Sequence, residues 1–405
     1  MSRVVDRLEQ LAQFGKYESG INRPLSTPQE RQARTLFAQW AQESGYALSQ
    51  DRVGNLFARR AGKRADLDPI LVGSHLDTVP TGGAYDGAYG VMAALGALEQ
   101  LDRDRASTQH PIDAVAWVGE EGSRFPIGCL GSAVFAGLTS TDDALAMRDE
   151  AGVTLGEALA SKDGGLLDLP MRPDQKTAAY LELHVEQGPV LEAAGVRLGV
   201  VSAITGQIRY RAEVQGASGH AGTVPMDHRA DALSGTAELI LALETAAKEA
   251  GGAVVTVGRL TVEPGGTNVI PARVSFSIDN RSPDAAKMEL IENAFHRKAE
   301  EVSKRRGVRV VLERLDVHNP TPMDERLREA LHRVASAMNQ KALDVPSGAG
   351  HDAMCIARIA PAAMLFVPSI GGRSHVAQER TSDSDLELGV DALARAIVEV
   401  DRLLA

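Results

Sequence analysis

Histidine and carboxylate side chains recur in four short clusters, each directly after an apolar run or within a glycine-rich loop. Imidazole nitrogens and carboxylate oxygens are donors that zinc takes in proteins, and manganese, cobalt or nickel can replace zinc at such sites. Two divalent ions that share a carboxylate can activate a water molecule and polarise a carbonyl group. The clusters hold enough donors for two such ions: His75, Asp86, Glu121, His184 and His375.

The first cluster follows the apolar residues 69–72 and leads through a glycine-rich loop into a predicted helix over residues 86–101. An α/β sheet presents its ligands in this way, at the carboxyl ends of its strands. We expect His75 and Asp86 to bind metal and Asp77 to hydrogen-bond His75, which would fix the tautomer of the imidazole. The same residues could instead cap the end of a strand, so this stretch alone leaves both interpretations open.

Glu120 and Glu121 follow a second apolar run, residues 112–118. In a pair of carboxylates one can bind metal while the other moves a proton between water and a leaving nitrogen. A solvated loop is the simpler interpretation of such a pair, and His184 could be an ordinary core histidine. The recurrence of these residue types at successive strand ends favours a shared site.

The composition is that of an ordinary globular protein, with 405 residues, 44% of them hydrophobic and 24% charged. The net charge of −11 argues against a nucleic-acid partner but leaves room for a local basic pocket that binds a small carboxylate. The two cysteines, Cys129 and Cys355, suit a reducing compartment. No apolar run suggests a signal peptide or a membrane span, so we expect a cytoplasmic protein.

Apolar strand-like runs alternate with amphipathic helix-like segments through most of the chain, which predicts an α/β fold with a mainly parallel sheet flanked by helices. The predicted strands are residues 48–58, 69–72, 112–118, 178–185 and 363–367. The predicted helices are residues 2–14, 28–45, 86–101, 130–137, 154–162, 324–339 and 383–404.

The pattern changes between residues 208 and 321, where the order of elements becomes β-α-β-β-α-β. The predicted strands there are residues 207–215, 254–262, 274–279 and 308–317, and the helices are residues 227–250 and 285–306. This order is typical of a split βαβ sandwich, whose open sheet face is a candidate for dimerisation. We therefore predict a catalytic domain in two parts, residues 1–207 and 322–405, with an α+β domain inserted at residues 208–321.

Seven motifs in chain order resemble those of the amidase, hydantoinase/carbamoylase family of dinuclear metallopeptidase-like hydrolases. They are GSHLDTV at 73–79, GGAYDG at 82–87, EEGSRF at 120–125, ELHVEQGP at 182–189, GHAGTVPM at 219–226, GAGHDA at 348–353 and SH at 374–375. That family includes N-carbamoyl-L-amino-acid hydrolases, allantoate amidohydrolases and β-ureidopropionases. The resemblance implies a catalytic domain interrupted by a lid and dimerisation domain, two metal ions and a homodimer.

The resemblance also implies a role for individual residues. Asp86 would bridge the two ions, and Glu120 would be the general acid and base. Five residues would bind the substrate: Gln187, His220, Asn268, Arg281 and His351. Arg281 can hold an α-carboxylate through two hydrogen bonds. His220 could donate to the developing oxyanion across a dimer when the lid closes. A surface salt bridge for Arg281 and a turn for Asn268 are the structural alternatives.

The resemblance implies hydrolysis of the C–N bond of an N-carbamoyl-L-amino acid, giving the amino acid, CO2 and ammonia. Allantoate, an N-acyl amino acid or a dipeptide are the alternative substrates, and a non-catalytic binding protein on the same fold is an alternative of another class. An NAD-dependent oxidoreductase would need a G-x-G-x-x-G loop after a strand, which the glycines of residues 82–90 do not form. The chain departs from the family pattern at Arg373, at Val376-Ala377 and in residues 125–129. Arg373 could favour a second acidic group.

Overall fold

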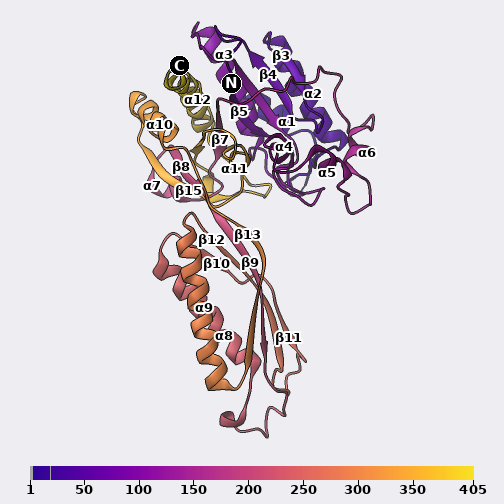
Figure 1. Ribbon diagram of the computed structural model, residues 1–405, viewed down its shortest axis with the longest axis vertical. Coiled ribbons are helices and arrows are strands. Elements are labelled where there is room, and N and C mark those ends of the chain that lie inside the picture. The colour runs from indigo at the N-terminus through magenta and orange to yellow at the C-terminus, as the bar shows by residue number, and fades with distance from the viewer. Residues whose placement is uncertain (1–2, 19) are drawn as a thin grey trace. The chain divides into compact units, whose positions relative to one another are not determined.

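The computed structural model describes residues 3–18 and 20–405. Tertiary contacts divide the chain into two compact units. The first unit consists of residues 1–202 and 323–405, and the second consists of residues 203–322 (Figure 1). The second unit is therefore an insertion in the sequence of the first.

A nine-stranded sheet lies mainly in the first unit. Its strands are β3 (Ala47–Gln50), β4 (Leu56–Arg60), β5 (Ile70–His75), β6 (Ile112–Trp117), β7 (Ala179–Val185), β8 (Leu198–Ile204), β14 (Thr321–Pro322), β15 (Ala342–Ser347) and β16 (Ala362–Val367). They follow the order β14-β8-β16-β7-β5-β6-β4-β3, and β15 also pairs with β8. The four central strands β16, β7, β5 and β6 are parallel, whereas β4, β3 and β8 pair antiparallel with their neighbours. The predicted α/β class with a mostly parallel central sheet is confirmed.

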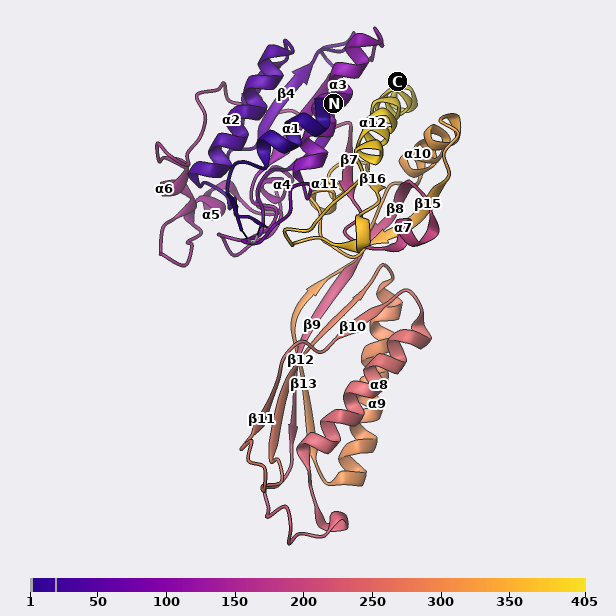
Figure 2. The ribbon, with the colours of Figure 1, turned by 180° about the vertical axis from the view of Figure 1, so that it is seen from behind.

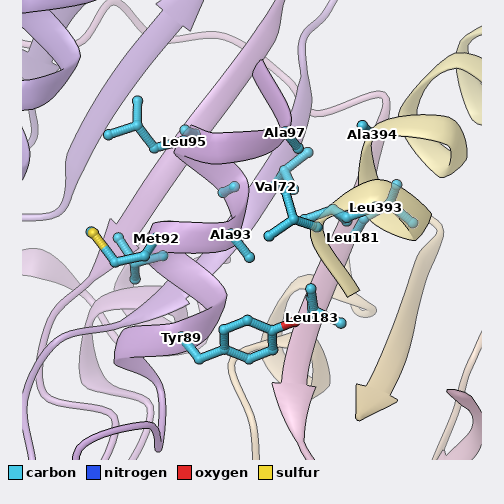
Figure 3. Packing of buried hydrophobic residues seen from close by; sticks show 14 of the residues in the cluster. Val72, Tyr89, Met92, Ala93, Leu95, Ala97, Leu181, Leu183, Leu393 and Ala394 are labelled. Carbon is cyan, nitrogen blue, oxygen red and sulfur yellow. The ribbon is translucent and has the colours of Figure 1, made fainter. Parts of the chain in front are cut away.

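Five helices share one hydrophobic core with one face of this sheet. They are α1 (Arg3–Leu11), α2 (Pro28–Glu43), α3 (Ala88–Arg103), α10 (Glu325–Ala337) and α12 (Asp383–Leu404). Because side chains alternate along a strand, Leu181 and Leu183 of β7 face this core while His184 faces away from it. Figure 3 shows Leu183 close to Tyr89 of α3, whose hydroxyl donates to Leu386 O of α12 at 2.9 Å.

The other face of the sheet carries an aromatic group and two short helices, α4 (Leu130–Phe135) and α11 (Ala353–Ile356). Trp117 of β6 packs edge-on against Phe135 of α4, with ring centroids 5.1 Å apart, and against Tyr180 of β7 at 6.1 Å. Each such aromatic pair contributes about 1 kcal/mol beyond the area it buries. This packing fixes the sheet beneath the strand ends that carry the predicted site.

The second unit has a five-stranded antiparallel sheet and two long helices. Its elements are β9 (Gly206–Gln215), α8 (Ala232–Ala250), β10 (Val254–Thr256), β11 (Leu260–Glu263), β12 (Arg273–Ser282), α9 (Ala285–Arg306) and β13 (Arg309–His318). Both helices lie on the same face of the sheet (Figure 2). The predicted split βαβ arrangement is confirmed, except that the strand predicted over residues 254–262 is divided around Gly258 into β10 and β11, which both pair with β12.

Some elements differ from the prediction for identifiable local reasons. The prediction misses β8, which runs almost directly into β9 with no turn residues to separate the two. It also misses β15, where Pro346 is tolerated because this strand lies at an edge of the sheet. Helix α8 begins at Ala232 rather than at residue 227, because the Asp231 side chain caps it by accepting the Ser234 N–H. No helix in the described ranges is long and apolar enough to cross a membrane.

Candidate metal centre

Three neighbouring parallel strands bring the predicted donors to one edge of the sheet. His75 is the last residue of β5, Glu120 and Glu121 follow β6, and His184 lies near the end of β7. The strand order β6-β5-β7 places these three ends next to one another. Asp86 comes from the loop before α3, and a distant loop adds His375.

Asp86 lies at the centre of the cluster and is buried. Its Oδ1 atom is 3.2 Å from Nε2 of His184 and 3.6 Å from Nε2 of His75. Its Oδ2 atom is 3.3 Å from Nε2 of His375. His375 Nε2 is also 3.6 Å from Oε2 of Glu121. The two oxygens of one carboxylate thus face two different sets of donors.

The donor atoms form groups that fit divalent cations. One group is His75, Asp86 and His184, and a second is Asp86, Glu121 and His375. Within each group the ligand atoms all lie within 4.8 Å of one another. A third group, of the same size, contains His75 with both glutamates. The first two groups share only Asp86.

The histidine tautomers also suit metal binding. His184 Nδ1 lies 2.9 Å from the carbonyl oxygen of Val185, and its Nε2 accepts the Gly87 N–H at 3.0 Å. Nδ1 therefore carries the proton of the neutral ring, and Nε2 lies 3.2 Å from Asp86 Oδ1. His75 is arranged in the same way, with Nδ1 3.0 Å from Asp77 O. Protonation at Nδ1 leaves Nε2 as the nitrogen that would bind a metal ion, which in His184 would replace the Gly87 N–H contact.

Asp77 contacts His75 through its backbone and not through its side chain. The backbone carbonyl of Asp77 makes the hydrogen bond, whereas its Oδ1 atom is 3.8 Å from His75 Nδ1. The carboxylate instead accepts the backbone N–H groups of Gly119, Glu120 and Glu121 at 3.0, 3.2 and 3.1 Å. Asp77 thereby fixes the turn after β6 that carries the two glutamates.

A hydrogen-bond network absent from the sequence prediction holds Asp86 in place. Glu379 is buried and accepts the backbone N–H groups of Tyr85 and Asp86 at 2.8 and 2.9 Å. The Ser374 hydroxyl lies 2.8 Å from Asp86 Oδ2 and 2.7 Å from Glu379 Oε2. Gln187 donates from Nε2 to Asp86 Oδ2 at 2.7 Å. These contacts tie the Asp86 loop to the loop of His375.

Glycine is required next to His75. Gly87 has φ +64°, and a Cβ atom added there would lie 2.3 Å from the His75 ring. The left-handed backbone and the short distance both exclude a larger residue. The glycine-rich loop therefore allows the backbone to pass directly against the imidazole.

The electrostatics of the cluster favour added positive charge. Burial raises the pKa of Glu120 well above its usual range, and burial together with Asp86 raises the pKa of Glu121 to about 7. The hydrogen bond with Asp86 raises the pKa of His375 to about 9. Burial alone would lower the pKa of His75, but the surrounding carboxylates, Glu120 first among them, hold it well above its ordinary value. A divalent cation at this position would favour the ionised form of these carboxylates and so lower their pKa values.

The predicted substrate residues lie in both units. In the first unit, His351 is buried against His184 with ring centroids 4.6 Å apart, and its Nε2 is 2.8 Å from Ser347 Oγ. In the second unit, His220 pairs with Val269 in an isolated β-bridge next to Asn268. Arg281 lies on β12, where its Nε is 2.9 Å from Asp279 Oδ1. The roles of these residues stay predictions.

Sequence and structure comparisons identify the family. Peptidase family M20/M25/M40 matches residues 71–399. The chain is 38% identical to an N-carbamoyl-L-amino acid amidohydrolase of Geobacillus stearothermophilus, over 98% of this chain and 97% of that protein. It is 39% identical to the allantoate amidohydrolase of Bacillus subtilis (strain 168), over 96% of this chain and 95% of that protein.

A solved amidase of the hydantoinase/carbamoylase family from Burkholderia multivorans superposes with a TM-score of 0.93 at 36% identity, covering 98% of this chain and 96% of that one. The chain therefore belongs to peptidase family M20/M25/M40. It is a hydrolase of that family, and its resemblance to the hydantoinase/carbamoylase amidases is confirmed.

Proposed function

We propose that this enzyme hydrolyses N-carbamoyl-L-amino acids to the amino acid, CO2 and ammonia at a dinuclear metal centre. The observation that carries the proposal is the pair of donor groups that share Asp86, with Glu120 beside them. The similarity to the Geobacillus amidohydrolase along nearly the whole of both chains supports the substrate class.

Five residues would hold the metal ions: His75 and His184 on one side, Glu121 and His375 on the other, and Asp86 between them. Zinc or manganese fits this mixture of imidazole and carboxylate donors, and cobalt or nickel could replace them. When bound, such ions supply a Lewis acid for the substrate carbonyl and lower the pKa of water.

Glu120 would move the protons. It is buried, its Oε2 is 3.6 Å from His75 Nε2, and its raised pKa favours a carboxylate that can hold a proton between two steps. The carboxylate would take a proton from the attacking water and return it to the leaving nitrogen. The reaction then balances as one ureido acid plus one water giving amino acid, CO2 and ammonia.

Residues of both units would recognise the substrate. Gln187 Oε1 is buried and accepts no hydrogen bond within the described residues, so it offers an acceptor for a ureido N–H. In the second unit, Arg281 would hold the α-carboxylate through two hydrogen bonds, with Asn268 as a further donor. His220 accepts the Gly222 N–H at Nδ1, at 3.0 Å, which leaves Nε2–H as a donor for a developing oxyanion.

The geometry of the second unit favours a homodimer. Arg281 pairs with Gln207 and Arg273 pairs with Gln215, so these two pairs are eight residues apart along one ladder, about 26 Å at the usual rise per residue. His220 and Asn268 lie beyond the Arg273 end. A small ureido acid is much shorter than this, so His220 of one copy would act together with Arg281 of another.

A second candidate substrate is allantoate. The specific observation is the 39% identity with the Bacillus subtilis allantoate amidohydrolase. The exposed Arg373, two residues before His375, could bind an additional acidic group. In either case the partner is a small carboxylate rather than a nucleic acid, and the buried thiols Cys129 and Cys355 suit the reducing cytoplasm.

The proposal is tested by measuring ammonia release from the manganese-loaded protein. N-carbamoyl-L-amino acids, N-carbamoyl-β-alanine and allantoate are compared, with amine release from N-acyl amino acids measured in parallel. We expect the highest kcat/KM with an N-carbamoyl-L-amino acid. Preference for allantoate would select the second candidate, and amine release from N-acyl amino acids alone would contradict both.

Replacing Arg281 with alanine should raise KM about tenfold or more for carboxylate substrates and change kcat little, because a carboxylate clamp acts in the ground state and transition state alike. Steady-state kinetics with a ureido acid and with its uncharged amide measure the effect. Arg211→Ala, which removes another arginine of the same sheet that pairs with Glu313, is the matched control. An unchanged KM for the ureido acid in the Arg281 variant would remove this residue from the site.

A further inference from the structure

The two carboxylate oxygens of Glu120 have different neighbours. Oε2 lies 3.6 Å from His75 Nε2, on the side of the metal ligands. Oε1 lies 3.4 Å from Cys129 Sγ, which donates to it. Cys129 is 5% exposed, so the contact is made away from bulk water. The thiol therefore acts on the one oxygen that does not face the centre.

The backbone fixes Cys129 against Glu120. The N–H groups of Cys129, Leu130 and Gly131 donate in turn to the carbonyl oxygens of Glu120, Gly119 and Val118, at 2.8, 3.1 and 2.8 Å. Cys129 has φ +53°, a conformation that non-glycine residues adopt rarely. These three hydrogen bonds hold the start of α4 against the residues that end β6 and follow it, and they thereby set the position of the thiol.

A second thiol completes the surroundings of Cys129. Cys355 of α11 is equally buried and packs in the same cluster as Cys129. The two cysteines pack in a small cluster with Ala133, Ala136 and Met354. The neighbouring Cys355 thiol, burial and the nearby Glu120 carboxylate hold the pKa of Cys129 well above its ordinary value. Cys129 therefore keeps its proton and stays a donor at neutral pH.

We propose that Cys129 is a positioning residue for Glu120, holding the carboxylate by a thiol hydrogen bond so that Oε2 faces the reacting groups. The inference rests on the proposed function, in which Glu120 moves the protons. A glutamate side chain turns freely about its terminal torsion unless an oxygen is held. Loss of the donor would let the carboxylate adopt orientations that do not support proton transfer.

Cys129→Ala removes the donor with a small change in volume. We expect kcat to fall about tenfold, the scale of one hydrogen bond to a charged group, with KM and metal content unchanged. Cys129→Ser keeps a donor at this position and should restore most of kcat. Met354→Ala, which reduces packing in the same cluster without touching Glu120, is the control and should lower Tm but not kcat.

A double-variant comparison separates this inference from the proposed function. In the Glu120→Gln background, Cys129→Ala should cause no further loss, because the two residues act as a unit. An equal kcat loss in Cys129→Ala and Cys129→Ser, or a full additional loss in the double variant, would overturn the positioning role. A normal kcat in Cys129→Ala with an inactive Glu120→Gln would overturn only this inference, whereas near-normal turnover of Glu120→Gln would contradict the proposed function itself.

Discussion

Glu120→Gln is expected to lower kcat by about three orders of magnitude while the metal content stays unchanged. Glutamine has the same shape but cannot accept and return a proton, and positioned acid–base groups contribute about 10²–10⁴ in rate. Oε2 of Glu120 lies 3.6 Å from Nε2 of His75, so Glu120 can act beside the ligands. Neither of the two donor groups that share Asp86 includes Glu120. Steady-state kinetics and metal analysis by mass spectrometry of the same preparation measure both quantities.

The neighbouring glutamate provides the contrast. Glu121 belongs to the donor group with Asp86 and His375, so Glu121→Gln should lose metal as well as activity. Equal metal loss in both variants would show that Glu120 is a ligand rather than the acid–base group. Near-normal turnover in Glu120→Gln would assign proton transfer to another residue.

The sequence predicts the central strands well because they are buried on both faces. The apolar residues of β5, β6, β7 and β16 stand out between polar loops, and the few polar members of these strands, such as Asp113 and Glu182, are buried with them. Parallel neighbours then bring His75, Glu120 and His184 to one edge of the sheet. An element with a mixed pattern, such as β15, does not stand out in this way.

The contacts that hold the donors are not predictable from local patterns. Glu379 and Asp86 are 293 positions apart in the chain, and their hydrogen bond depends on how two loops approach each other. Cys129 is likewise recognisable as a neighbour of the Glu120 side chain only once the start of α4 is placed along the end of β6. The spacing of Asp77 indicates support for His75, but it does not distinguish the carbonyl group from the carboxylate.

Asp86→Asn should reduce binding at both predicted metal positions and lower kcat by at least about three orders of magnitude. The change is nearly isosteric, but it removes the negative charge that faces three histidines. The amide of asparagine has one oxygen, whereas the carboxylate of Asp86 has two and belongs to both donor groups. Equilibrium dialysis against buffered manganese, followed by metal analysis, measures the bound ions per chain.

His375→Asn distinguishes a shared ligand from an ordinary one. His375 belongs to only one of the two groups that share Asp86, so its replacement should weaken one position and leave the other close to the wild-type affinity. Because a ligand that binds only the folded state stabilises it, manganese should raise Tm in the wild type and less in His375→Asn, but hardly at all in Asp86→Asn. Identical stoichiometry and Tm shifts in the two variants would mean that Asp86 does not bridge, and the two donor groups would then have to be treated as one site with alternative ligands.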